Sequence, residues 1–413
     1  MTKGQTKVTI VGGGVAALEA LIALRRIAQE RVALELVTPT PEWAYQPLAV
    51  AEPFGLGEAT RYDLVRVARD HAATMHLAGV QAVRPDDHEL VTWDGRTLGY
   101  ELLLLAIGAR AQTGLPGSVM IKGPGYTGRF RTVLRDLEAR RIRRVAFAVP
   151  AGASWPLPLY ELALMTAAHV GERRLRHVEL TIVTPEDEPL ELFGSAASEA
   201  MRELLGERGV ALHLRRYPAA VEGAQLRFVP EGSIGADRVV SLPQLIGPSL
   251  PGVREDADGF IPTDLHGLVR GERDVYAAGD ATTCPIKQGG IATQQADAAA
   301  EAIAARLGAD VEPEPFRPVL RGMLLTGKAP RFLRTDLSGT AGDSSTVSDQ
   351  ALWWPPNKIA GRWLAPYLAL AHDELETPSG VPVDTDLSGV KSRRVIARDR
   401  AGHAVAVRSG ADT

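Results

Sequence analysis

A turn of three glycines joins a run of β-branched residues to a helix-forming stretch near the start of the chain. Residues 8–11 read Val-Thr-Ile-Val, residues 12–14 are all glycine, and the sequence that follows is rich in alanine and leucine. This order predicts the first strand–turn–helix unit of a dinucleotide-binding fold. Gly12 permits the tight turn, and Gly14 lets the backbone approach a pyrophosphate at the start of the helix. Ala17 takes the place of the third glycine, and its methyl group still permits close packing of helix and strand.

A second apolar strand that ends in small residues lies far downstream. Residues 274–280 read Asp-Val-Tyr-Ala-Ala-Gly-Asp, and an alanine-rich helix is predicted to open within residues 285–292 and to run to about Arg306. Gly279 leaves room for a bulky cofactor, and Asp280 offers a carboxylate to its hydroxyl groups. The positive N-terminal end of the helix would face an anion.

The stretch between these two motifs predicts another nucleotide-type unit, whose glycine turn is degenerate. Strands are expected at residues 144–149 and 178–183 with a helix between them, but only Gly152 remains of the turn. Trp155 and two prolines would fill the space and remove amide donors that a pyrophosphate requires. We therefore expect a second domain without a nicotinamide fingerprint, and direct oxidation of NAD(P)H is disfavoured.

The order of the motifs implies that one domain is inserted in another, because the first and last motifs must meet in one pocket. We predict an α/β fold with two Rossmann-like dinucleotide-binding domains, the second inserted in the first, plus a smaller C-terminal domain. The first domain would take residues 1–118 and 250–315, and the second residues 119–249. Residues 316–413 would form a capping or interface domain, with a closing hairpin between residues 390 and 408.

Three motifs in this order resemble those of the pyridine nucleotide-disulfide oxidoreductase family. They are the glycine turn, the strand at residues 102–109 with its Ala-Ile-Gly sequence, and the signature at residues 276–280. Ile107 stands where the family usually has threonine. Within the family, the chain is most similar to the branch that contains sulfide:quinone oxidoreductases and type II NADH dehydrogenases. The resemblance implies that the first domain binds FAD.

The general pattern of dinucleotide sites and the resemblance together indicate the cofactor contacts. Thr38 and Glu42 follow the second strand, near the place where ribose is usually held. In the family, the residue at the position of Val80 contacts the adenine, and the residue at the position of Pro47 flanks the isoalloxazine ring. Lys287, at the start of the late helix, would stabilise reduced flavin. The predicted cofactor-binding residues are Gly12, Gly14, Ala17, Thr38, Glu42, Pro47, Val80, Ala106, Gly108, Gly279, Asp280, Lys287, Gln288 and Gly289.

The chain contains a single cysteine, Cys284, so a redox-active internal disulfide is impossible. Cys284 and Lys287 are the candidates for catalytic residues, the cysteine either as a thiolate near the flavin or as a small packing residue. Glu161 resembles a glutamate that follows the nucleotide turn in type II NADH dehydrogenases. Because the glycines of that turn are missing, we expect a solvated or capping role for it.

These observations lead to three hypotheses of function. The first is an FAD-dependent oxidoreductase that passes electrons from a small donor, sulfide or a related sulfur compound, through flavin to a quinone-like acceptor. The second is an NAD(P)H:quinone reductase with an atypical nicotinamide site. The third is a flavin-binding interaction protein without turnover.

Composition and charge limit the classes of partner that we expect. The formal net charge is −4, which disfavours nucleic acid as a partner. The histidines are scattered without metal-ligand spacing, so no metal is expected. No targeting segment or membrane-spanning run is apparent, which predicts a cytoplasmic protein. Homo-oligomer formation stays open.

One C-terminal segment, residues 351–370, contains half of the tryptophans. Ile359, Trp363, Tyr367 and Leu370 recur there at helical spacing. This pattern suits peripheral membrane contact or the mouth of a quinone channel, and core packing is the alternative.

Overall fold

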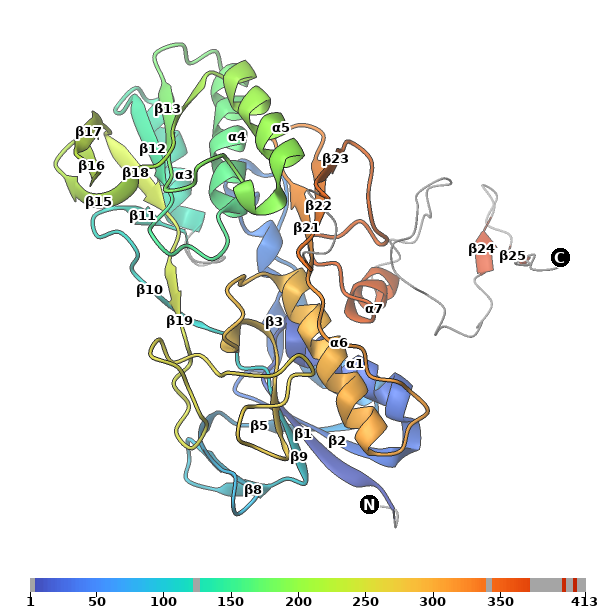
Figure 1. Ribbon diagram of the computed structural model, residues 1–413. Coiled ribbons are helices and arrows are strands. Elements are labelled where there is room, and N and C mark those ends of the chain that lie inside the picture. The colour runs from blue at the N-terminus through green and yellow to red at the C-terminus, as the bar shows by residue number, and fades with distance from the viewer. Residues whose placement is uncertain (1–3, 122–126, 339–343, 372–395, 399–403, 407–413) are drawn as a thin grey trace.

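Five parallel strands form the first sheet of the protein (Figure 1). The computed structural model describes residues 4–121, 127–338, 344–371, 396–398 and 404–406. In spatial order the strands are β20 (Val275–Ala277), β9 (Leu102–Leu105), β1 (Thr6–Val11), β2 (Val32–Thr38) and β5 (Ala73–Leu77). Because β20 lies beside β9, the chain returns to this sheet after building most of the rest of the molecule.

Two long helices cover one face of the first sheet. They are α1 (Val15–Ala28) and α6 (Gly289–Arg306), which pack closely against each other. Their alanine-rich faces share a core with Val8 and Ile10 of β1, and small side chains permit this close approach. The late helix is therefore confirmed, although it begins at Gly289, several residues after Pro285.

A small antiparallel sheet covers the opposite face. Its strands are β6 (Val80–Arg84), β7 (Glu89–Thr92) and β8 (Thr97–Gly99). Val83 and Leu90 of this sheet pack with Leu103 and Leu105 of β9. The central strands are thus buried on both faces, which explains why β9 is a continuous run of leucine. A hairpin of β3 (Glu42–Ala44) and β4 (Arg61–Asp63) and the helix α2 (Leu64–Asp70) complete this part of the fold.

The second sheet repeats this layered plan. Its five parallel strands, in spatial order, are β11 (Val119–Met120), β18 (Arg238–Ser241), β12 (Arg144–Ala148), β13 (Glu179–Val183) and β14 (Val210–His213). The core on one face includes residues of α3 (Thr127–Glu138), α4 (Leu157–Glu172) and α5 (Ser195–Glu207). Residues of the antiparallel strands β15 (Tyr217–Glu222), β16 (Gln225–Val229) and β17 (Gly232–Gly235) pack on the other. These two sheets confirm the predicted α/β fold class, while the predicted domain boundaries stay predictions.

The chain crosses between the two sheets at one paired ribbon. β10 (Arg110–Gln112) leaves the first sheet, β19 (Gln244–Ile246) returns to it, and the two strands pair antiparallel. Arg110 also donates through Nε to the carbonyl of Gly247 at 3.1 Å. The outgoing and returning connections therefore hold each other in place.

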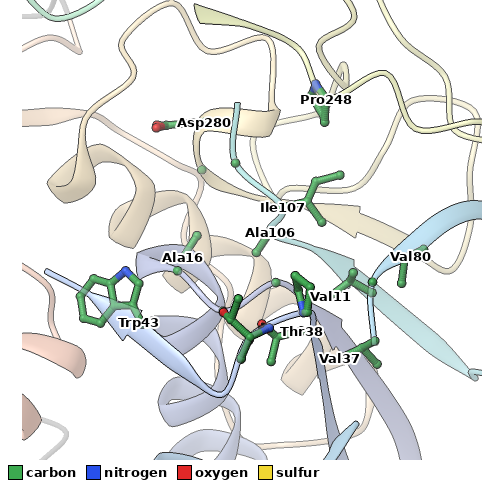
Figure 2. A pocket seen from close by; sticks show the side chains of 18 of the residues that line it. Val11, Ala16, Val37, Thr38, Trp43, Val80, Ala106, Ile107, Pro248 and Asp280 are labelled. Carbon is green, nitrogen blue, oxygen red and sulfur yellow. Dashed lines mark hydrogen bonds between the residues drawn. The ribbon is translucent and has the colours of Figure 1, made fainter. Parts of the chain in front are cut away.

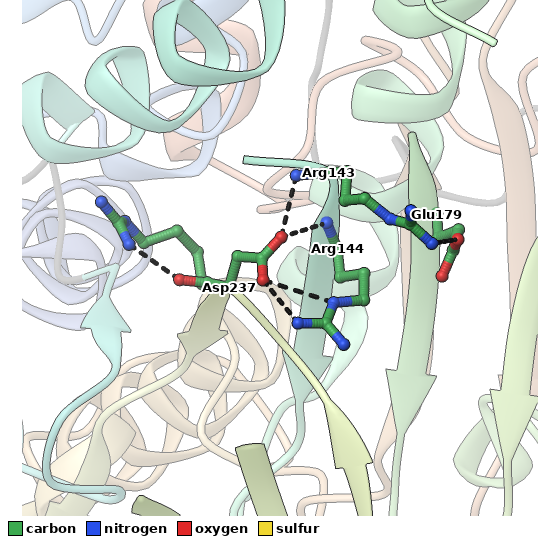
Figure 3. Close-up of polar contacts among 5 residues, drawn as sticks. Arg143, Arg144, Glu179 and Asp237 are labelled. Atoms are coloured by element: carbon green, nitrogen blue, oxygen red, sulfur yellow. Dashed lines mark hydrogen bonds and ion pairs between the residues drawn. The ribbon is translucent and has the colours of Figure 1, made fainter. Parts of the chain in front are cut away.

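An ion-pair network lies at the amino-terminal ends of three neighbouring strands of the second sheet (Figure 3). One carboxylate oxygen of Asp237 accepts the backbone N–H groups of Arg143 and Arg144 at 2.9 and 3.0 Å. The other lies 2.7 Å from Nη2 of Arg144, and Arg143 pairs with Glu179 at 2.6 Å. The hydrogen bond from the Arg144 side chain lowers the pKa of Asp237 to about 2. The network thus joins the starts of β12, β13 and β18.

The C-terminal part begins with a three-stranded antiparallel sheet, β21 (Val319–Leu324), β22 (Arg331–Asp336) and β23 (Thr346–Ser348). The last helix among the described residues is α7 (Leu364–Ala371). The predicted hairpin near the end is confirmed by the antiparallel pairing of β24 (Ile396–Arg398) with β25 (Ala404–Ala406); its turn lies outside the described residues. In the described part of the chain, no helix is long and apolar enough to cross a membrane.

The structure corrects the helical stripe predicted within residues 351–370. Regular helix begins only at Leu364, so the four stripe residues do not share one helix face. Pro366 lies in the first turn of α7, where a missing N–H costs little, and this position explains why the helix does not extend further back. Ile359 is buried against the α1 and α6 layer, and only Leu370 of the four is largely exposed, at 62%. We call residues 351–371 the covering segment.

Candidate functional site

A cavity of about 690 Å³ opens at the carboxyl ends of the first sheet (Figure 2). The turn between β1 and α1 forms its floor, and residues after β2, β9 and β20 line its walls. In the sheet order, β1 separates β2 from β9, and this reversal of strand order is where open α/β sheets bind ligands. The cavity is therefore the principal candidate for a binding site.

The glycine turn has the geometry of a phosphate cradle. Gly12 has φ +134°, and a Cβ atom built on it would lie 2.2 Å from the carbonyl oxygen of Ala106. A Cβ on Gly13 would lie 2.6 Å from Oγ1 of Thr38. Gly14 has open space around its Cα, and as the N-cap of α1 it supplies no side chain to the first amides of the helix. Free amide groups at a helix N-terminus attract an anion such as a diphosphate.

Two polar residues after β2 line the same cavity. Thr38 is buried, and its hydroxyl donates weakly to the carbonyl of Thr40 at 3.3 Å. Glu42 is exposed and pairs with Arg61 at 3.3 Å. Trp43, which stacks on Tyr62 with ring centroids 5.6 Å apart, adds an aromatic wall that the sequence did not single out. The structure thus brings a hydroxyl, a carboxylate and an indole together beside the cradle.

Asp280 lies at the opposite wall, after β20. Burial raises the pKa of this carboxyl to about 6, and the positive charge of Lys287 lowers it in part. Lys287 itself is not among the residues that line the cavity. Its Nζ donates to the carbonyl oxygen of Thr282 and lies 3.7 Å from the ring centroid of Phe260, and burial lowers its pKa. Lys287 can therefore act on a ligand here only through its electrostatic field.

The start of α6 borders the cavity through Gly289 and Ala292. Gln288 does not line it. Its Oε1 accepts the N–H of Ile291 at 2.8 Å, and its Nε2 donates to the carbonyl of Arg321 at 3.1 Å, so Gln288 caps the helix.

Most predicted cofactor contacts meet in this cavity. Ten of them line it, namely Gly12, Gly14, Thr38, Glu42, Val80, Ala106, Gly108, Gly279, Asp280 and Gly289. Of the others, Ala17 is buried between α1 and the sheet, and Pro47 follows the lining residue Gln46. Ile107, at the position where the family has threonine, also lines the cavity.

Cys284 lies apart from this cavity. It borders a separate hollow of about 470 Å³ with Thr263, Arg270 and Phe316. Burial raises the pKa of its thiol, so the unreactive thiol form is favoured over the thiolate. This placement favours a packing role for Cys284 over a reactive one.

The equivalent turn of the second sheet is filled by side chains. Pro156 stands at the N-cap of α4, and Trp155 packs against Phe193 with ring centroids 5.7 Å apart. After β13, where an acidic residue would hold a ribose, Glu186 accepts hydrogen bonds from Tyr160 at 2.6 Å and Thr184 at 2.7 Å. One oxygen of this carboxylate, Oε2, is thus already hydrogen-bonded within the protein, while the buried Oε1 has no hydrogen-bond partner among the described residues.

A buried ion pair corrects the expectation for Glu161. This side chain is fully buried and accepts two hydrogen bonds from Nζ of Lys358, each 2.7 Å long, and a third from the backbone N–H of Leu325 at 2.8 Å. Burial raises the pKa of Glu161, and the charge of Lys358 opposes that rise. Lys358 also donates to the carbonyl of Pro47 at 3.2 Å. The pair therefore joins α4, the covering segment and the loop beside the cavity, and no local sequence signal links two residues 197 positions apart.

Comparison with known proteins relates this arrangement to a large group of enzymes. A family model described as pyridine nucleotide-disulphide oxidoreductase matches residues 6–302. The fold is similar to that of the sulfide:quinone oxidoreductase from the hyperthermophilic bacterium Aquifex aeolicus, with 18% identity, a TM-score of 0.76, and coverage of 89% of this chain and 90% of that chain.

Two other solved structures share the fold at lower similarity. A ferredoxin reductase from Rhodopseudomonas palustris is 17% identical, with a TM-score of 0.62 over 81% of this chain and 83% of that one. NDH2 from Plasmodium falciparum, in complex with NADH, is 14% identical, with a TM-score of 0.56 over 67% and 64%. At these identities the likeness shows a common fold.

Proposed function

The chain belongs to the pyridine nucleotide-disulphide oxidoreductase family, and from this premise we propose that it passes electrons from a small sulfur donor to a quinone-like acceptor. The protein is an FAD-dependent oxidoreductase. Membership in this family argues against a flavin-binding interaction protein without turnover. The identities of the donor and the acceptor are the proposed part.

The cavity at the first sheet has the features that FAD requires. In this proposal, the amide groups at the start of α1 hold the diphosphate, and the Gly12 turn lets the backbone approach it. Asp280 accepts a hydrogen bond from a ribityl hydroxyl, and the N-terminal end of α6 at Gly289 stabilises negative charge on the ring. FAD, when bound, supplies the electron transfer, while the protein supplies orientation and electrostatics.

The observation that carries the choice of donor is the filled turn of the second sheet. A reductase that oxidises NADH needs a second nucleotide site, and here Trp155, Pro156 and the Tyr160–Glu186 hydrogen bond occupy that place. A small donor needs no such site. Because the chain has one cysteine, the donor's sulfur cannot be carried on a cysteine pair, which favours direct reaction at the flavin.

Two observations support a quinone-like acceptor. The Aquifex aeolicus protein that shares the fold is named for quinone as its acceptor. In this chain, a Cβ built on Gly289 would lie 2.8 Å from Ile359 of the covering segment, so the cavity has an apolar neighbour on that side. We extend the proposal to a cytoplasmic protein that meets the membrane surface through the end of α7, where Leu370 is exposed.

Anaerobic mixing of the purified yellow protein with candidate donors tests this function. We expect sulfide to bleach the flavin absorbance and a short-chain quinone to restore it, while NADH and NADPH leave it unchanged within the same time. Free FAD treated in the same way is the control for reaction outside the protein. Rapid bleaching by NADH or NADPH would instead establish the NAD(P)H:quinone reductase, the second hypothesis.

A further inference from the structure

Trp93 is a large apolar side chain that the folded chain leaves 67% exposed. Its ring lies against the backbone of Gly79, because a Cβ atom built on Gly79 would fall 2.2 Å from Cδ2 of Trp93. The backbone N–H of Trp93 also donates to the carbonyl of Gly79 at 2.8 Å. One side of the indole is thus supported by the protein, while much of its surface stays free. Tryptophan is highly buried on average, so an indole that is exposed to this extent offers a large apolar surface to a ligand.

The turn that carries Trp93 is held in one conformation. The N–H of Thr92 donates to the carbonyl of Arg96 at 2.9 Å, and the N–H of Gly95 donates back to Thr92 at 2.9 Å. The Arg96 side chain donates to Asp94 at 2.7 Å. A side chain on a fixed turn loses little conformational freedom when a ligand binds to it.

Trp93 lines the end of the cavity at which its ring packs on Gly79. Its neighbours there are Ala78, Gly79, Val80 and Gln81, which follow β5 and begin β6. Figure 2 shows Val80 and Val37 at this end, and Trp43 and Asp280 toward the other, with the β1–α1 turn between them.

FAD has a planar ring system at each end of its diphosphate. With the diphosphate at the glycine turn and the isoalloxazine ring toward Asp280 and α6, the adenine falls at the end that holds Trp93.

We propose that Trp93 stacks on the adenine ring of FAD and fixes the nucleotide half of the cofactor. None of its neighbours at this end, Ala78, Gly79, Val80 and Gln81, is aromatic, so the indole is the only extended aromatic surface among these lining residues. Every base presents a π-face to an aromatic side chain, and stacking of this kind is worth a substantial part of a nucleotide's affinity. The inference depends on FAD binding in this cavity and is independent of the donor and the acceptor.

The test compares the affinity of the full-length protein for FAD and for FMN, which lacks the adenine. Equilibrium dialysis of wild type, Trp93→Ala, Trp93→Leu and Trp93→Phe gives the two dissociation constants. We expect Trp93→Ala and Trp93→Leu to weaken FAD binding about tenfold and Trp93→Phe to keep it within about threefold. FMN binding should stay unchanged in all three variants. Leu77→Ala, which truncates a similarly exposed residue on β5, is the matched control and should bind FAD normally.

Trp93→Leu keeps much of the side-chain bulk and guards against a folding defect in Trp93→Ala, and thermal unfolding of each variant checks the fold. Unchanged FAD affinity in Trp93→Leu would overturn the proposal. An equal loss for FMN and FAD would also overturn it, because that result would place the flavin ring or a structural role at Trp93.

Discussion

The two parallel sheets of this protein have the same layered plan, but the turn after the central strand is open in one and filled in the other. Each has five strands, helices on one face and a three-stranded antiparallel sheet on the other. In the first sheet the turn after the central strand is glycine and faces a cavity. In the second sheet, Trp155 and Pro156 occupy the corresponding turn, and Trp155 packs against Phe193. The fold alone therefore does not decide whether a nucleotide can bind. A few residues after the central strand of each sheet decide it.

The difference is one of space and of free hydrogen-bonding groups. At the first turn, Gly14 leaves the first amides of α1 open, and the described residues show no hydrogen bond to the Asp280 carboxylate. At the second, Tyr160 donates to Oε2 of Glu186, and the other carboxylate oxygen of Glu186 is buried. A binding site needs both an unfilled volume and unpaired polar groups.

Paired substitutions of one glycine in each turn give the largest expected effect. Gly12→Ala would place a Cβ 2.2 Å from the carbonyl of Ala106 at a positive φ, so we expect FAD binding to fall at least about 100-fold. In Gly152→Ala the nearest atom would be 3.9 Å away, and we expect FAD to be retained at a cost of about 1 kcal/mol in stability. The flavin-to-protein absorbance ratio after gel filtration measures both. Equal retention of FAD would remove the distinction drawn between the two turns.

The next largest effect is expected from breaking the Glu161–Lys358 ion pair, which joins α4 to the covering segment. Lys358→Met would leave the carboxylate of Glu161 buried without its partner, and we expect the free energy of unfolding to fall by about 3–5 kcal/mol. The double variant Glu161→Gln with Lys358→Met should recover part of this loss, because no charge is then buried alone. Urea unfolding of wild type, Lys358→Met and the double variant measures both changes in the free energy of unfolding. If Lys358→Met were as stable as wild type, the Glu161–Lys358 ion pair would contribute nothing to stability.

A smaller and pH-dependent effect is expected for Asp237, at the amino-terminal ends of the inner strands of the second sheet. The pKa of Asp237 is lowered to about 2, which means that the folded state favours the charged carboxylate. The stability that this carboxylate contributes to the fold is therefore present above about pH 4 and is lost as the pH falls toward 2. Because the group is near the surface, we expect Asp237→Asn to cost about 1 kcal/mol at pH 7. Unfolding of the two proteins at pH 7, 5, 4 and 3 should show a constant difference that shrinks below pH 4. FAD content should not change, since the network lies away from the first turn; a difference that grows in acid would contradict the assignment.

The smallest effect is expected for Cys284→Ser. The thiol borders a different cavity from the predicted flavin site, and burial keeps it protonated. We expect the rate of flavin reduction by the physiological donor to change by less than about twofold. Stopped-flow reduction of the variant measures this, and a loss of a hundredfold or more would return Cys284 to the reaction.

The sequence predicted those parts of the molecule that local backbone chemistry controls. The β1–Gly12–α1 unit, the α6 helix and the strands around residues 144–149 and 178–183 follow from residue type and spacing, because glycine, β-branched and alanine-rich runs restrict the backbone on their own. Ten of the predicted contacts share one cavity for the same reason, since strand ends of a parallel sheet meet at one edge. The helical stripe in the covering segment was wrong because spacing alone cannot tell where a helix begins.

Tertiary structure alone decided which side chains meet. The sequence contained Glu161 and Lys358, Tyr160 and Glu186, and Gly79 and Trp93, but it gave no sign that they are partners. Such contacts depend on how separate elements pack and on the direction of each side chain, which are set by the whole core and not by neighbours along the chain. The sequence by itself therefore determined that a dinucleotide turn exists, while packing decided that the first turn stays open and the second is closed.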